Sequence, residues 1–160
     1  MKSAYTFMVL LVFTFVVLLT FLLNEAYGSE ICGLGYRPNV IYDPYLQSVG
    51  SAHIDLWMIR INPQVMSQFP PVAQHFWFEH ECAHLVVGDS EIKADCRATK
   101  VLVYTGILTK DNLQQLMDSI SVLPGSKDHP PGRVRAEHIK QCATTDPIPK
   151  NDQLLVKFMK

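Results

Sequence analysis

The residues His-Glu-Cys-Ala-His at positions 80–84 restrict the function of this chain more than any other stretch. On a helix, His80 and His84 lie one turn apart on the same face, so both imidazoles can reach one metal ion. Glu81 lies about 100° further round, where it can contact a water on that ion without being a ligand. The spacing therefore predicts a metal site with a carboxylate beside it.

Acidic residues downstream of His84 are candidates for a third ligand. Glu91 is in the first turn of a second predicted helix, nearest to the point where the two helices meet, and we expect it to bind the metal. Asp89 lies at the turn with too short a side chain to reach back. Asp95 lies about 5.4 Å further along the helix, where it can accept a hydrogen bond from a ligand imidazole. Two histidines and one carboxylate leave a position open for water, as in catalytic zinc sites, and such donors also take other divalent ions.

The motif lies within a predicted helix that starts at Pro70-Pro71 and stops at Gly88. A second helix is predicted over residues 90–104. The helix face opposite the two histidines is apolar and can enter the core. Its members are Phe78, Cys82, Leu85 and Val86.

The rest of the chain adds short strands and two further helices to this helix pair. Strands are predicted at residues 39–42 and 54–61, with a turn at Gly50-Ser51 between them. The additional helices are predicted from residue 109 or 110 to residue 122 and over residues 133–142.

The four cysteines predict two disulfides if the chain is exported. We expect Cys82 to pair with Cys96, which would bridge the two helices of the site on their core side. Cys32 would then pair with Cys142 and tie the ends of the domain together. Cys82 points about 160° to 200° away from both histidines, so it is not expected to bind the metal. Buried free thiols are the alternative.

The N-terminal region predicts export. Residues 4–23 carry no charge and follow Lys2, so residues 1–28 are interpreted as a signal peptide or an N-terminal membrane anchor. The two alternatives remain open, but both place residues 29–142 outside the cytoplasm. Residues 143–160 form a C-terminal tail to which we assign no role.

The motif and the segment Glu91-Ile92-Lys93-Ala94-Asp95 resemble the gluzincin zinc peptidases. The likeness is closer to the small one-domain members, in which HECAH is followed by ADC, than to thermolysin itself. The resemblance covers residues 50–142 and implies an α+β domain, with a few-stranded antiparallel sheet packed on two active-site helices and further helices C-terminal. The gap from His84 to Glu91 is shorter than in the larger members, so a tight turn at residues 88–90 must fold the second helix back. Flanking segments that are also similar are Asn62-Pro63, Pro70-Pro71 and His129-Pro130-Pro131-Gly132 with Arg135.

The resemblance also implies a mechanism, in which Glu81 takes a proton from a zinc-activated water and delivers it to the leaving amine. In similar peptidases a histidine or tyrosine outside the motif stabilises the oxyanion. His129, in its proline-rich loop, is our candidate, and Tyr42 and Tyr104 are alternatives. The strand at residues 54–61 is either a core strand or an edge strand that pairs with an extended peptide substrate.

We therefore expect an exported or membrane-anchored zinc metallopeptidase that acts on peptides or proteins. The net charge is −1, and the absence of a basic cluster argues against a nucleic-acid partner. The main alternative is a zinc-binding interaction or chaperone-like module of the cell envelope without turnover. A hydrolase of non-peptide amides and a metal-free structural domain are two others. His53, His75 and His138 are expected to have no part in the metal site.

Overall fold

The computed structural model describes residues 32–33 and 35–145. Residues 1–28, interpreted above as a signal peptide or anchor, lie outside the described residues, as does the tail from residue 146 onward. Within the described part, none of the helices combines the length and hydrophobicity needed to span a bilayer.

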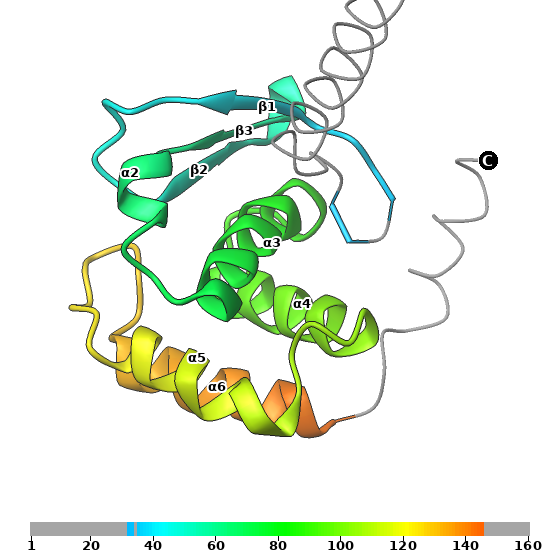
Figure 1. The fold of residues 1–160 in the computed structure, drawn as a ribbon. Coiled ribbons are helices and arrows are strands. Elements are labelled where there is room, and N and C mark those ends of the chain that lie inside the picture. Colours follow the sequence, from blue (N-terminus) through cyan, green and yellow to red (C-terminus); the bar gives the residue numbers. More distant parts are fainter. Residues whose placement is uncertain (1–31, 34, 146–160) are drawn as a thin grey trace, which may run out of the picture. The chain divides into compact units, whose positions relative to one another are not determined.

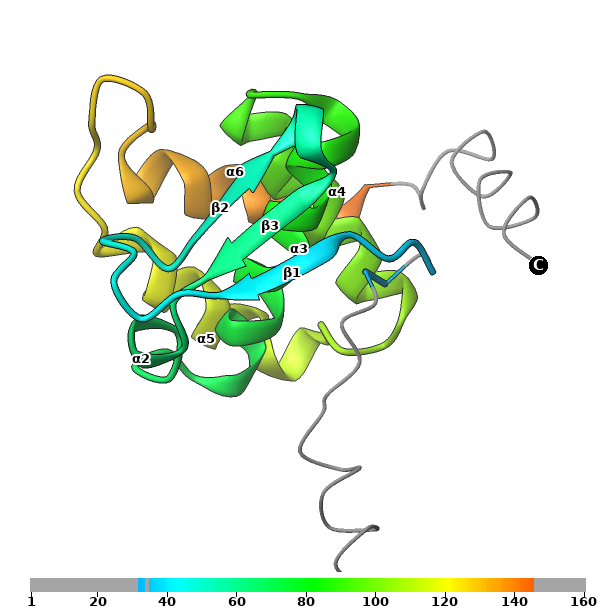
Figure 2. The same cartoon turned by 90° about the horizontal axis from the view of Figure 1, so that it is seen from above.

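Helix α3, which carries the motif, lies at the centre of an α+β domain (Figure 1). A three-stranded sheet covers one side of α3, and α4, α5 and α6 lie on the other. Figure 2 shows the sheet from above, with α3 beneath it. The strands are β1 (Asn39–Tyr42), β2 (Gly50–His53) and β3 (Met58–Ile61). The helices are α2 (Pro63–Met66), α3 (Pro71–Val87), α4 (Glu91–Tyr104), α5 (Lys110–Ser121) and α6 (Gly132–Thr144), with a 3-10 turn, η1 (Ile54–Leu56), between β2 and β3.

The sheet is mixed, so the predicted antiparallel sheet is wrong in part. The strand order is β1-β3-β2, with β2 antiparallel and β1 parallel to β3. The predicted strand at residues 54–61 is also too long, since the chain reverses through η1 and Trp57, whose φ is 47°. The segment is rich in apolar residues on both sides of Trp57, so its composition does not reveal this reversal. The residues predicted as a turn, Gly50-Ser51, belong to β2 instead. In the strand order β1-β3-β2, β2 is an edge strand and β3 is the central strand.

Asn62 explains where β3 ends and α2 begins. Its Oδ1 accepts hydrogen bonds from the backbone N–H groups of Gln64 and Val65, which caps α2. Its Nδ2 donates to the carbonyls of Pro44 and Leu46, so the same side chain also fixes the loop that follows β1. The amide is buried, and all of these bonds replace water that it has lost.

The helix boundaries near the site agree with the local signals in the sequence. Helix α3 starts at Pro71 and ends before Gly88, whose φ of 77° suits a residue without a Cβ. Helix α4 starts at Glu91, after Ser90 in the N-cap position. The turn of residues 88–90 is therefore tight enough to fold α4 back against α3, as the short spacing required.

The core consists of two clusters, one on each side of α3. Phe76 and Trp77 belong to the cluster shared with α4, α5 and α6. Cys82 and Leu85 belong to the cluster beneath the sheet, with Phe78 at its margin. Helix α3 is thus buried on two sides rather than along a single apolar stripe, and Val86, predicted to be part of that stripe, is exposed.

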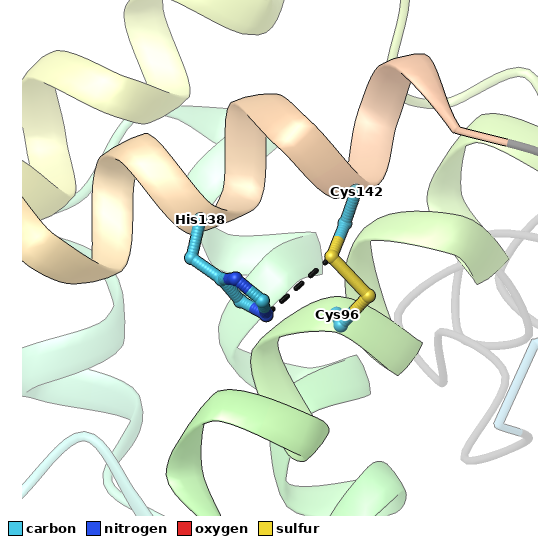
Figure 3. Close-up of side chains that lie close together, drawn as sticks. All are labelled: Cys96, His138 and Cys142. Carbon is cyan, nitrogen blue, oxygen red and sulfur yellow. Dashed lines mark hydrogen bonds between the residues drawn. A yellow bond between two sulfur atoms is a disulfide. The ribbon is translucent and has the colours of Figure 1, made fainter.

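All four cysteines form disulfides, but the predicted pairing is wrong. Cys32 pairs with Cys82, and Cys96 pairs with Cys142. Cys82 belongs to the sheet-side cluster, where Cys32 and Tyr36 also lie, and Cys96 is not a member of that cluster. The second disulfide joins α4 to α6 (Figure 3). Two disulfides are typical of a protein that folds in an oxidising compartment outside the cytoplasm.

Candidate metal centre

His80 and His84 lie on one face of α3 with their ring nitrogens directed at each other. The two Nε2 atoms are 3.0 Å apart, and both side chains are buried. Glu91, at the start of α4, lies across from them. Its Oε2 is 3.3 Å from His80 Nε2, and its Oε1 is 3.3 Å from His84 Nε2. The structure therefore brings the three predicted ligands together.

An acceptor oxygen lies close behind Nδ1 of each imidazole. Asp95 Oδ1 lies 2.9 Å from His80 Nδ1. The carbonyl of Gly88 lies 2.8 Å from His84 Nδ1, so the glycine that ends α3 also orients a candidate ligand. In a neutral ring these acceptors place the proton on Nδ1, which leaves Nε2 of each histidine free to bind a cation beside Glu91.

Arg135 of α6 holds the Asp95 carboxylate, and the sequence indicated this residue only through the resemblance to the small zinc peptidases. Its Nε and Nη2 donate to Asp95 Oδ2 and Oδ1 at 2.8 and 2.6 Å, in a fully buried bidentate pair. The guanidinium also lies over the Trp77 ring, 5.1 Å from its centroid, and 3.4 Å from Glu91 Oε2. Arg135 thus fixes the carboxylate that fixes His80. The only sequence signal for this role was its place after the His129 loop.

The charges of the centre are strongly coupled. Burial alone lowers the pKa of His80, but the Asp95 and Glu91 carboxylates outweigh it and raise that pKa to about 9. Burial raises the pKa of Glu91, yet His80 and His84 more than offset this and hold the pKa well below its usual range. Burial also raises the pKa of Asp95, but the hydrogen bonds from Arg135 outweigh burial and, with His80, lower that pKa. Both acids are therefore ionised and act as acceptors or ligands.

Glu81 lies beside the two histidines, buried but lining the same cleft. Burial raises the pKa of its carboxyl group, against the attraction of His80 and His84. Its position depends on Gly50 of β2, because a Cβ at Gly50 would lie 2.6 Å from Glu81 Cγ and 2.8 Å from its Oε1. No pattern in the sequence indicates that Gly50 approaches the motif.

His129 also reaches the centre. Its Nε2 lies 3.5 Å from Glu91 Oε1, while its side chain remains about half exposed. Its Nδ1 lies 3.1 Å from the hydroxyl of Ser126, which also accepts hydrogen bonds from the backbone N–H groups of Asp128 and His129. The alternatives Tyr42 and Tyr104 are exposed and are not among the cleft residues.

The centre forms the floor of a cleft of about 570 Å³. One wall is the chain of β2 and the residues just before it, which present an edge strand to the cleft. Another part of the wall is apolar and consists of Val49, Val65, Phe69, Trp77 and Leu123. The arrangement can therefore accommodate an extended chain with apolar side chains above the three candidate ligands.

Comparisons with protein-family models, with curated proteins and with solved structures found no match. The likeness to zincins therefore rests on the motif and its spacing. The class of site is defined by its own geometry, as a cluster of two histidines and a glutamate beside a buried carboxylate.

Proposed function

We propose that the protein is a zinc-dependent peptidase. The observation that carries this proposal is the meeting of His80, His84 and Glu91 next to Glu81, on the floor of a cleft bordered by an edge strand. Three protein ligands with a free position characterise catalytic zinc sites, whereas structural zinc sites are closed by four.

The donor set fits zinc well. It consists of two imidazole nitrogens and a carboxylate, and Asp95 and Gly88 lie against the rings in the manner common around zinc. A zinc ion held there would act as a Lewis acid and would lower the pKa of a coordinated water towards neutrality.

The residues around the candidate ligands have distinct tasks in this proposal. Glu81 accepts the proton of the attacking water and passes it to the leaving amine, and its raised pKa suits a group that must both take and give a proton. His129 is close enough to the centre to donate a hydrogen bond to the oxyanion of the substrate. Asp95 and Arg135 keep His80 in place.

The edge strand supports a peptide as the substrate class. An extended peptide can pair with the exposed edge of β2, which replaces the strand at residues 54–61 in this role. Exclusion of water by the apolar part of the cleft would strengthen each polar contact with the substrate. The two disulfides and the uncharged segment at residues 4–23 together support action outside the cytoplasm, as a secreted or anchored protein.

Removal of the metal tests this function. The purified protein is expected to contain one zinc per chain and to cleave a library of peptides. A chelator should abolish cleavage and added zinc should restore it. His80→Ala, His84→Ala and Glu91→Ala should each lose most of the bound zinc, because each removes a ligand. Elemental analysis and mass spectrometry of the peptide products measure the two quantities.

Two variants serve as controls for the ligand set. His75→Ala removes an exposed histidine from the same helix and should leave zinc unchanged. Asp95→Asn should weaken zinc binding by only about 10- to 100-fold, because it removes an orienting group. Equal zinc content in all variants would refute the site. Zinc without any peptide cleavage would favour the non-catalytic binding module.

Gly50→Ala tests the placement of Glu81. The new methyl group must displace the Glu81 side chain, because the gap between their atoms is too small. A displacement of about 1 Å is expected to lower kcat by roughly 10²-fold, with zinc content unchanged. Ser51→Ala on the same strand is the matched control and should retain activity. A fully active Gly50→Ala variant would show that Glu81 does not depend on this contact.

A further inference from the structure

A second cluster of metal-ligating side chains lies between α4 and α6. It contains Cys96 of α4 and both His138 and Cys142 of α6 (Figure 3). His138 Nε2 lies 3.5 Å from Cys142 Sγ, and the ligand atoms of all three residues lie within 4.8 Å of one another. Cys96 and Cys142 form a disulfide, so their sulfur atoms cannot bind a metal in this state.

The backbone keeps these three residues together without the disulfide. His138 and Cys142 are one turn apart on α6, so they share a face. Helix α4 is held against α6 by the buried pair of Asp95 and Arg135, and Asp95 directly precedes Cys96. Cys96 and His138 are partly exposed, which gives an ion a path to the cluster.

We propose that Cys96, His138 and Cys142 form a second zinc site when their disulfide is reduced. Two thiolates and one imidazole are a preferred ligand set for zinc among the common divalent ions. The disulfide and the metal exclude each other, so this pair of helices is linked either by a covalent bond or by an ion. The proposal is independent of the peptidase assignment, because it shares no ligand with the first centre.

A dithiol reductant can open the Cys96–Cys142 disulfide. The dithiol gives two electrons and two protons to the disulfide, which yields the thiols of Cys96 and Cys142 and an oxidised, disulfide form of the reductant. Zinc then binds the two thiolates and the His138 imidazole, and the two thiol protons are released to solvent. Reoxidation requires the zinc to leave.

Among the described residues, the Cys32–Cys82 disulfide has neither solvent access nor a neighbouring third ligand. Cys32 and Cys82 are both fully buried, so an attacking thiolate has no access to their sulfur atoms. No third ligand accompanies them among the metal-ligating clusters of residues 32–33 and 35–145. Reduction under mild conditions should therefore open the Cys96–Cys142 bond first.

Thiol alkylation tests this inference on the purified protein. The protein is reduced mildly with a phosphine, desalted without oxygen, and alkylated with and without zinc. Peptide mapping then reports each cysteine separately. We expect alkylation of Cys96 and Cys142 without zinc and its loss with zinc, since bound thiolates do not react freely. Cobalt in place of zinc should give a thiolate-to-metal charge-transfer band, which the first centre cannot produce because it has no thiolate.

His138→Gln is the decisive variant, since it removes a ligand and leaves both disulfides intact. It should lose zinc protection at both cysteines, whereas His75→Gln, an exposed histidine elsewhere, should behave as wild type. His80→Ala should also keep the protection, which separates this site from the first. Equal alkylation with and without zinc in the wild-type protein would overturn the proposal. Protection that persists in His138→Gln would do so too.

Discussion

Replacement of Glu81 by glutamine is expected to lower kcat for peptide cleavage by roughly 10²- to 10⁴-fold, with zinc content unchanged. Glutamine has nearly the same size as glutamate, so the contact with Gly50 and the packing of α3 should persist. It cannot accept a proton from water, and this loss alone should account for the effect. Steady-state kinetics with a fluorogenic peptide, together with elemental analysis, measure both quantities.

Glu79→Gln is the matched control for this experiment. Glu79 is also a buried glutamate of α3, but its Oε1 accepts a hydrogen bond from the N–H of Gly33, away from the cleft. The same substitution there should leave the rate of cleavage close to wild type. A Glu81→Gln variant with near wild-type kcat would show that another group is the base, and an equal loss in both variants would point to a structural cause.

Replacement of Arg135 by methionine is expected to reduce the free energy of unfolding by about 3–5 kcal/mol. Methionine keeps most of the apolar stem beside Trp77, but Asp95 loses both of its hydrogen bonds from the guanidinium. The Asp95 carboxylate has no exposure to solvent, so its charge would remain buried without its main partner. Denaturant unfolding under non-reducing conditions, with both disulfides intact, measures the change.

Arg133→Met separates this effect from a general loss of charge on α6. Arg133 is exposed on the same helix, and its replacement should change the free energy of unfolding by less than about 0.5 kcal/mol. If Arg135→Met is as stable as Arg133→Met, the pair of Asp95 and Arg135 does not stabilise the fold. Zinc titration of Arg135→Met should also show weaker binding, because Asp95 would no longer be held against His80.

Local signals in the sequence were sufficient for the helices around the centre. The spacing of His80 and His84 follows from the helical period, and the ends of α3 follow from the conformational preferences of Pro71 and Gly88. The position of Glu91 follows in turn, because a short link forces α4 to start beside the end of α3. These are properties of residues close together in the chain, and nearby backbone hydrogen bonds determine them.

Contacts between residues far apart in the sequence determined the disulfide pairing, the strand pairing and the bond between Arg135 and Asp95. The pairing of Cys32 with Cys82 spans 50 positions, that of Cys96 with Cys142 spans 46, and the bond from Arg135 to Asp95 spans 40. The parallel pairing of β1 with β3 and the approach of Gly50 to Glu81 belong to the same group. Composition and periodicity specify which face of an element is buried, but they do not specify which other element covers it. That choice depends on how the helices and the sheet pack together, and packing is a property of the whole chain.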